Sequence, residues 1–179
     1  MTITDISILP TIGVGLLVLR LVLGFSMAAH GTQKLFGWFR GYGLAGTAGF
    51  FEQIGFRPGH VFAATAAAGE VVSGLLVALG LFGPVGPALM ISVMIVAIGS
   101  VHLPHGFFAT QNGIELPFLY AVGALTLALA GFGMFSVDAA LGLSSVWTAH
   151  LVWGVVAIGI VGGGLNLALR RPAPSEVSV

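Results

Sequence analysis

The stretch HVFAATAAAGEVVSGLLVALGLF at residues 60–82, followed by the turn GPVGP at residues 83–87, decides the fold class of this chain. Its only Asp, Glu, Lys or Arg is Glu70, and a helix that crosses a bilayer needs about 20 predominantly apolar residues. The clustered Gly and Pro reverse the chain into another apolar stretch at residues 87–103, which Pro104 stops. This pattern predicts two antiparallel membrane-spanning helices.

The composition of the whole chain agrees with this reading. Of its 179 residues, 57% are hydrophobic and 7% are charged, and the mean hydropathy is +1.07. Soluble domains are roughly half apolar and about one quarter charged. Four or five spans of about 20 residues would use most of the chain. We therefore predict an all-α, polytopic transmembrane helical bundle without a separate soluble domain.

Further apolar stretches complete the bundle. The first span is predicted at about residues 11–30 and the fourth at about residues 116–133, and the stretch from Val146 to Leu169 is long enough for a fifth. We divide the chain into a four-span bundle, residues 1–145, and a fifth span with a short basic tail, residues 146–179.

Charge and cysteine content exclude several classes of function. The formal net charge is zero, so the clustered positive charge that binds nucleic acid is missing. The chain has no Cys, which excludes disulfides and thiolate ligands within it. Residues 1–10 contain no Lys or Arg, so we read the first apolar stretch as a retained span and not as a cleaved signal peptide.

The basic residues outside the spans predict the orientation. In a five-span arrangement they all fall on one side of the membrane: Lys34, Arg40, Arg57, Arg170 and Arg171. Short cytoplasmic loops are enriched in Lys and Arg, so we expect this side and the C-terminus in the cytoplasm and the N-terminus outside. A four-span arrangement with the last stretch lying in the interface would divide these residues between the two sides.

The connector between the first two spans, Gly31 to Gly59, is expected to be a polar, aromatic and Gly-rich loop. Within it, the segment LAGTAGFFEQIGF, Leu44 to Phe56, predicts a short amphipathic helix at the cytoplasmic interface. Thr47 is its expected N-cap, and Phe50, Phe51 and Ile54 share one face.

Two charged residues fall inside predicted spans, where each costs about 2.5 to 3.5 kcal/mol at mid-membrane. Arg20 comes ten residues before His30, and Glu70 comes ten after His60. If both His mark the membrane boundary, both charges lie about 15 Å deep, near the middle of a ~30 Å core, and can meet. One interpretation is an ion pair that fixes helix register. The other is a polar pocket or proton relay.

A second polar group is expected at the cytoplasmic face. It contains His30, Gln33 and Lys34 from the first span, His102 and His105 from the end of the third, and Asn112 and Glu115 from the start of the fourth. Arg20 and Lys34 fall in one sector of the first helix, so one cavity reaching from the interface to the midplane, and to Glu70, is a natural hypothesis. Alternatively, these residues cap helix ends and reach to interfacial water.

Such a cavity would suit a polar ligand with carbonyl or hydroxyl groups. Lys and His would donate hydrogen bonds, Glu would accept them or carry a proton, and Phe36, Phe107 and Phe108 would form apolar walls. A quinone head group fits this description. Pro104 interrupts the pair of His102 and His105, so the spacing matches no strong zinc or haem motif, and we predict no metal site.

Several segments, in this order and spacing, resemble the DoxX family of small bacterial membrane proteins over residues 16–141. They are RLVLGFSMAAHGTQKLFGW (20–38), FFEQIGFRPG (50–59), AAAGEVVSGLLVALGLF (66–82), VHLPHGFF (101–108), NGIELP (112–117) and GFGMFSVD (131–138).

The resemblance implies a four-helix bundle in the bacterial inner membrane. The DoxX family is related to a wider group of redox-associated membrane proteins that includes the methylamine-utilisation and vitamin K epoxide reductase types. Members are linked to quinone-coupled sulfur oxidation and to complexes that handle oxidative or thiol stress. The family pattern falls on Arg20, His30, Gly31, Lys34, Glu70, His102, Gly106, Phe107, Gly113 and Glu115. This chain departs from the pattern in its fifth span, and it lacks the Cys pairs of the thiol-active relatives.

Two functions follow as hypotheses. The first is a redox-associated membrane subunit that binds a quinone or similar amphiphile among its helices, or anchors a redox partner, and is at most part of a quinone-linked oxidoreductase. The second is a non-catalytic scaffold or assembly factor whose fifth helix docks a larger complex. A small transporter is a weaker third, because the charge pair would plug the bundle and no broken-helix pair is evident. In each case we expect contact with membrane lipid and with a protein partner or a second copy of the chain.

Overall fold

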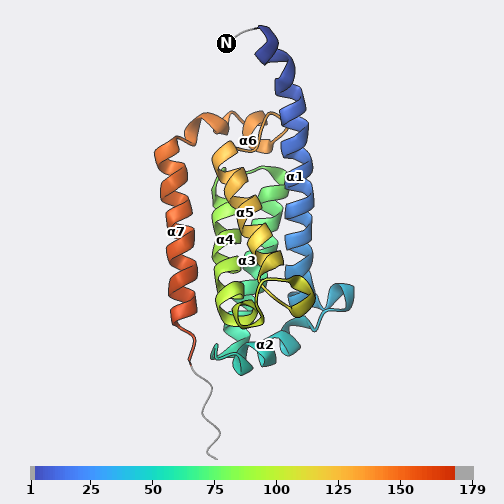
Figure 1. Ribbon diagram of the computed structural model, residues 1–179, viewed down its shortest axis with the longest axis vertical. Coiled ribbons are helices and arrows are strands. Elements are labelled where there is room, and N and C mark those ends of the chain that lie inside the picture. Colours follow the sequence, from blue (N-terminus) through green and yellow to red (C-terminus); the bar gives the residue numbers. More distant parts are fainter. Residues whose placement is uncertain (1–2, 172–179) are drawn as a thin grey trace, which may run out of the picture.

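The computed structural model describes residues 3–171. Five helices of this range lie side by side in an elongated bundle (Figure 1). They are α1 (Ile3–Phe36), α3 (Gly59–Leu79), α4 (Val85–Ala97), α5 (Glu115–Ala130) and α7 (Ala149–Ala168). A shorter helix lies at each end: α2 (Gly43–Gln53) where α1 finishes, and α6 (Val137–Ala140) at the opposite end (Figure 1). Since the described residues form no strand, the predicted all-α fold class is confirmed.

Four segments in the described range are long and apolar enough to cross a membrane. They are Ile8–Phe36, Gly59–Leu79, Val85–His105 and Ala149–Ala168. The last is the stretch predicted as a fifth span. Helix α5 has only 16 residues, about 24 Å at 1.5 Å per residue, so the predicted fourth span at 116–133 is too long. Gly131, at φ 77° and ψ 176°, follows the last residue of α5 in a positive-φ conformation that cannot continue a helix, and Gly133 also has a positive φ, 75°.

Small residues set the register between α1 and α3. A Cβ on Gly24 would lie 2.5 Å from the Gly74 oxygen, and one on Gly31 would lie 2.7 Å from the Ala67 oxygen. Both distances are far below van der Waals contact, so only glycine allows the two backbones to approach this closely. Such close helix packing through small residues is typical of membrane proteins.

Helix α7 packs closely against α4 through glycines in the same way. A Cβ on Gly159 would lie 2.5 Å from the Ala88 oxygen, and one on Gly163 would lie 2.8 Å from the Ser92 oxygen. Although α7 stands at the edge of the bundle (Figure 1), its packing against α4 is as close as that of α1 against α3.

The end of α4 departs from regular α-helix. Residues Ile98–His102 form a π-helical turn, η2, and Leu103–His105 form a 3₁₀ turn, η3. Pro104 was predicted to stop the third span, and the span does end there: the α-helix runs to Ala97, and the two turns continue it to His105. Single π-helical turns inside helices are frequent at functional sites.

The connector between the first two spans is more helical than predicted. Helix α1 continues to Phe36, a 3₁₀ turn η1 (Trp38–Arg40) follows, and α2 fills most of the remainder. Thr47 lies inside α2 and donates its hydroxyl hydrogen to the Gly43 oxygen at 2.8 Å, so the prediction that it is the N-cap is wrong. The predicted apolar face is also narrower, because Phe51 is buried whereas Phe50 is exposed.

The predicted basic groups gather at one end of the molecule. Lys34, Arg40 and Arg57 flank α2. Arg170, just past α7, reaches the same end, where its Nε donates to the Ile54 oxygen at 2.6 Å. The opposite end carries Asp138 in α6. This arrangement agrees with the five-span distribution of basic residues inferred from the sequence.

Candidate functional site

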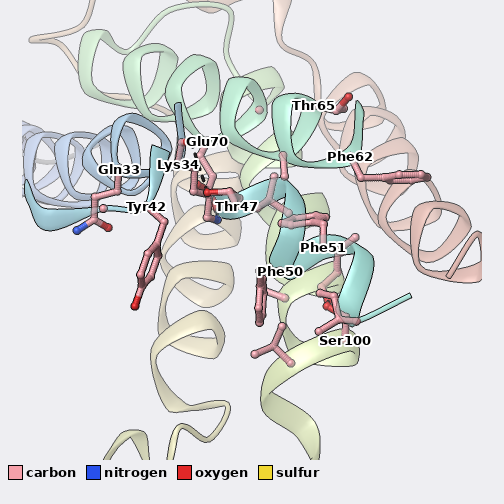
Figure 2. A pocket seen from close by; sticks show the side chains of 18 of the residues that line it. Gln33, Lys34, Tyr42, Thr47, Phe50, Phe51, Phe62, Thr65, Glu70 and Ser100 are labelled. Carbon is pink, nitrogen blue, oxygen red and sulfur yellow. Dashed lines mark hydrogen bonds and ion pairs between the residues drawn. The ribbon is translucent and has the colours of Figure 1, made fainter. Parts of the chain in front are cut away.

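A cavity of about 780 Å³ opens between α2, α3 and α4 at the basic end of the bundle. We call it the α2 cavity. Helix α2 contributes Phe50 and Phe51 to its wall, and α3 contributes Phe62, Thr65 and Glu70 (Figure 2). Further wall residues come from α4, from η2, and from α7, which supplies one residue. They are Leu89, Ser92, Val93, Val96, Ala97, Ser100, Val101, His102 and Asn166.

Glu70 is the buried charge of this cavity. Glu70 is 2% exposed, and its carboxylate oxygen Oε1 forms an ion pair with Nζ of Lys34 (Figure 2). Its Oε2 has no hydrogen-bond partner among the described residues. Lys34 has a side chain that is 33% exposed, so the pair joins the buried carboxylate to a more open cation. Thr47 lies beside the pair, with its hydroxyl 3.4 Å from the Lys34 backbone oxygen.

The predicted contact between Arg20 and Glu70 is wrong. The Arg20 Nη2 donates to the Phe135 oxygen at 2.8 Å, and its guanidinium carbon lies 5.8 Å from the centre of the Phe132 ring. A Cβ on Gly80 would lie 1.8 Å from Arg20 Nη1. Arg20 is therefore enclosed near the far end of α3 and does not line the α2 cavity.

The physical reason for this error is helix register. The prediction placed His30 and His60 at one level, but Gly31 packs against Ala67. Ala67 lies two turns beyond His60, which is about 11 Å along the axis. Helix α1 also continues past His30 to Phe36. The two charges are thus displaced along the bundle, and Lys34 reaches Glu70 instead.

His102 lines the α2 cavity from the π-helical turn. Its Nδ1 lies 2.8 Å from the backbone oxygen of Asn112. Because a carbonyl oxygen can only accept, this contact requires the proton on Nδ1, which leaves Nε2 of a neutral ring as an acceptor. The hydrogen bond thus sets which ring nitrogen carries the proton.

The remaining predicted site residues fall into two groups. Gln33 lines the cavity, and its Nε2 donates to the Phe39 oxygen at 3.3 Å. The others do not line it and have local partners. The His30 ring packs edge-on against the Tyr120 ring, with 6.0 Å between the ring centres. His105 Nδ1 lies 2.9 Å from the Val101 oxygen, and Glu115 Oε2 accepts from the Ala109 nitrogen at 2.8 Å. Asn112 contributes its backbone oxygen to the contact with His102.

Four of the predicted site residues thus line the cavity: Gln33, Lys34, Glu70 and His102. Five do not: Arg20, His30, His105, Asn112 and Glu115. Of these five, Asn112 still contacts His102 through its backbone oxygen. The predicted apolar walls also change. Phe36, Phe107 and Phe108 lie outside the cavity lining, where Phe50, Phe51 and Phe62 stand instead.

Sequence reasoning missed the mouth of the cavity, formed in part by Arg40 and Tyr42 in the segment GWFRGYG. Phe39 and Arg40 have positive φ values of 51° and 64°, which cost energy for residues other than glycine. A Cβ on Gly41 would lie 2.3 Å from the Gln33 oxygen, so this turn is folded tightly against the end of α1. The three glycines were the available signal for a special turn.

The described residues contain no group of three or more His, Cys, Asp or Glu side chains that could hold a metal ion. The cavity lining combines ammonium, carboxylate, imidazole and amide groups with aromatic side chains.

Comparison with known proteins places these features in a family. The DoxX family model matches residues 15–103, a range that includes Lys34, Glu70 and His102 but ends before α5 and α7. No curated protein and no solved structure matches the chain. Its four long apolar helices and this match agree, and the chain is a multi-pass membrane protein that belongs to the DoxX family.

Proposed function

We propose that this protein binds a quinone or similar amphiphile in the α2 cavity, as a subunit of a redox-associated membrane complex. The observation that carries the proposal is the Glu70 carboxylate, which is buried, paired on one oxygen with Lys34, and without a partner on the other among the described residues. A buried polar atom without a partner costs about 1 to 3 kcal/mol. A ligand hydroxyl that donates to Oε2 would recover this energy.

The chemistry of the cavity matches both redox forms of a quinone. Carbonyl oxygens of the oxidised form accept hydrogen bonds, which Lys34 can donate. Hydroxyl groups of the quinol donate, and Oε2 of Glu70 and Nε2 of His102 can accept them. Phe50, Phe51 and other aromatic or aliphatic residues supply the apolar wall. A volume of about 780 Å³ lies within the range of about 300 to 1,000 Å³ that is usual for small-molecule sites.

Reduction of a quinone to a quinol takes two electrons and two protons. Glu70 and His102 are groups that can pass protons. The electrons would come from a redox partner protein, because the chain has no Cys to supply a dithiol. The proposal therefore assigns this chain the binding and proton-handling part of an oxidoreductase and leaves electron delivery to a partner.

We also propose the bacterial inner membrane as the location, with the α2 end in the cytoplasm. The basic residues at that end support this orientation through the positive-inside rule. A single Cys introduced at the exposed Gln53 would be unique in the chain. It should resist a membrane-impermeant maleimide in intact spheroplasts and react after lysis; reaction in intact spheroplasts would reverse the orientation.

Binding of decylubiquinone and of a short-chain menaquinone analogue to the purified protein in detergent tests the function. The parent protein should bind at least one of them, and Glu70→Gln should weaken binding by about tenfold, since one hydrogen bond to a charged group contributes about 1.5 kcal/mol or more. Glu115→Gln is the matched control, because it makes the same chemical change outside the cavity.

A second pair of variants tests His102 in the same assay. His102→Ala should weaken binding, whereas His105→Ala should not, although both rings bond to a backbone oxygen in the same way. Absence of quinone binding by the parent protein would refute the proposal. Equal affinities for all four variants and the parent would instead place the quinone elsewhere on the protein.

The assembly-factor hypothesis predicts a different result. There, the Lys34 and Glu70 pair would serve only to hold α1 and α3 together. Glu70→Gln would then lower the amount of folded protein, and neither the parent nor the variant would bind quinone.

A further inference from the structure

The residues directly after α7 contact the connector between α2 and α3. Arg170 Nε donates to the Ile54 oxygen at 2.6 Å, and the Arg171 backbone nitrogen donates to the Gly55 oxygen at 2.8 Å. Gly55 has a φ of +96°, and a Cβ there would lie 2.0 Å from the Arg171 oxygen. Two hydrogen bonds and one glycine thus fix the end of α7 to the residues directly after α2.

Apolar contacts support the same junction. Leu167 packs against the cluster formed by Phe51, Phe56 and Ala63, and Phe51 belongs to the wall of the α2 cavity. A Cβ on Gly99 would lie 2.4 Å from the Leu167 side chain, so Leu167 also touches the π-helical turn. One residue of α7 therefore packs against both this cluster and η2, and both contribute residues to the cavity wall.

Asn166 brings a polar group from α7 to the cavity itself. Among the described residues, its side-chain amide makes no hydrogen bond to the protein. Asn166 is partly exposed, and its amide can both donate and accept hydrogen bonds. Asn166 is therefore placed to bind a polar atom of a ligand.

From these contacts we propose that the C-terminal helix α7 completes the ligand site. Asn166 is a binding residue, and Arg170 is a positioning residue that holds α2 over the cavity as a lid. The Asn166 part rests on the proposed function, because it requires a ligand in the α2 cavity. The lid part stands on protein contacts alone. Because the family match ends at residue 103, both features belong to a segment outside the matched region.

The lid can be tested without any ligand. Thr47 belongs to α2, lines the cavity and is 6% exposed, and Thr47→Cys is close to isosteric. In that background, Arg170→Ala should raise the labelling rate with a water-soluble maleimide severalfold. Arg171→Ala is the matched control, since it removes an equal charge but leaves the backbone hydrogen bond to Gly55. Equal labelling rates in these two variants would overturn the lid.

The binding role of Asn166 needs a ligand assay. Asn166→Leu should weaken decylubiquinone binding by about fivefold to tenfold. The maleimide labelling rate should be the same in Thr47→Cys and in the double variant Thr47→Cys with Asn166→Leu. Unchanged affinity would overturn the role of Asn166. The size-exclusion profile of each variant must match that of the parent protein.

Arg170→Lys is a rescue variant for the lid, because it keeps a side-chain donor. It should label as slowly as the parent with Arg170 if loss of the hydrogen bond to Ile54 causes the faster labelling.

The two proposals fail in different ways. If no quinone binds to the parent but Arg170→Ala still accelerates labelling, the proposed function fails and the lid remains. If quinone binds and labelling is the same in Arg170→Ala and Arg171→Ala, the proposed function remains and the lid is overturned.

Discussion

Arg20 and Glu70 are both charged, both nearly inaccessible and both inside the bundle, at 1% and 2% exposure, yet their surroundings differ. Arg20 is enclosed by Gly80, Phe132 and the Phe135 oxygen. Glu70 borders a cavity of about 780 Å³ and forms an ion pair with Lys34. Burial of a charge is therefore weak evidence for a site by itself. The space beside the charge decides whether a ligand can use it.

The largest effect is expected from Gly80→Ala, which would disrupt the enclosure of Arg20. Gly80 has a φ of +67°, and a Cβ there would lie 1.8 Å from Arg20 Nη1. Left-handed backbone costs about 1 to 2 kcal/mol for alanine, and overpacking adds about 1 to 3 kcal/mol. We expect a loss of about 2 to 5 kcal/mol, measured by unfolding in mixed SDS micelles.

Gly142→Ala separates these two contributions. Gly142 has a φ of +70°, and the space that a Cβ would enter there is open to 4 Å. This variant should therefore lose only the ~1 to 2 kcal/mol of backbone strain. Equal losses in both variants would show that the enclosure of Arg20 contributes nothing.

Lys34→Met should rank second, because it leaves the Glu70 carboxylate buried without its cation. Removing one partner of a fully buried pair costs about 3 to 5 kcal/mol. Since Lys34 is one-third exposed, we expect about 2 kcal/mol in the same unfolding assay. The double variant Lys34→Met with Glu70→Met should recover most of this loss; no recovery would mean that the pair is not coupled.

Arg20→Met tests the other side of the comparison with a smaller effect. Arg20→Met removes the hydrogen bond to the Phe135 oxygen but also two buried nitrogens, Nε and Nη1, that have no partner among the described residues. These costs and gains oppose each other, so the expected change in unfolding free energy is within about 1 kcal/mol. Quinone affinity should stay within twofold of the parent, because Arg20 does not line the cavity. A tenfold loss of affinity would show that the two charges act on one site after all.

Glu115→Gln should have the smallest effect. Its Oε2 accepts from the Ala109 nitrogen, and Gln keeps an acceptor at lower strength, so we expect about 0.5 kcal/mol of destabilisation. Unfolding in mixed micelles measures the change. A loss of unfolding free energy above about 2 kcal/mol would mean that the hydrogen bond from Ala109 to Glu115 stabilises the protein more than expected for a partly exposed contact.

The sequence predicted much of the fold because the hydrophobic pattern acts along the chain. The apolar stretches, the turn at Gly83 to Pro87 and the basic residues required no knowledge of packing. The length of α5 could not be predicted in this way, since its end depends on the backbone at Gly131 and Gly133. The short helix of the connector was predicted and is present as α2, whereas the continuation of α1 to Phe36 was not predicted. That extension is stabilised by contact with α2, where Thr47 donates to the Lys34 oxygen.

The candidate site was predictable only in part. Lys34, Glu70 and His102 stand out as polar residues in apolar surroundings, which a sequence displays directly. Their partners do not stand out, because the pairing of Lys34 with Glu70 depends on where Gly31 meets Ala67. Asn166 and Phe51 reach the cavity from segments far apart in the chain, and no local pattern signals such a contact.

The amino-acid sequence by itself determined that this protein is an all-α membrane bundle with few internal charges, because partition of apolar residues from water is a local and additive property. Only the tertiary structure decided which charges meet, which are enclosed and which border a cavity. Those outcomes depend on close approach between helices at a few glycines, where a shift of two turns replaces one partner by another.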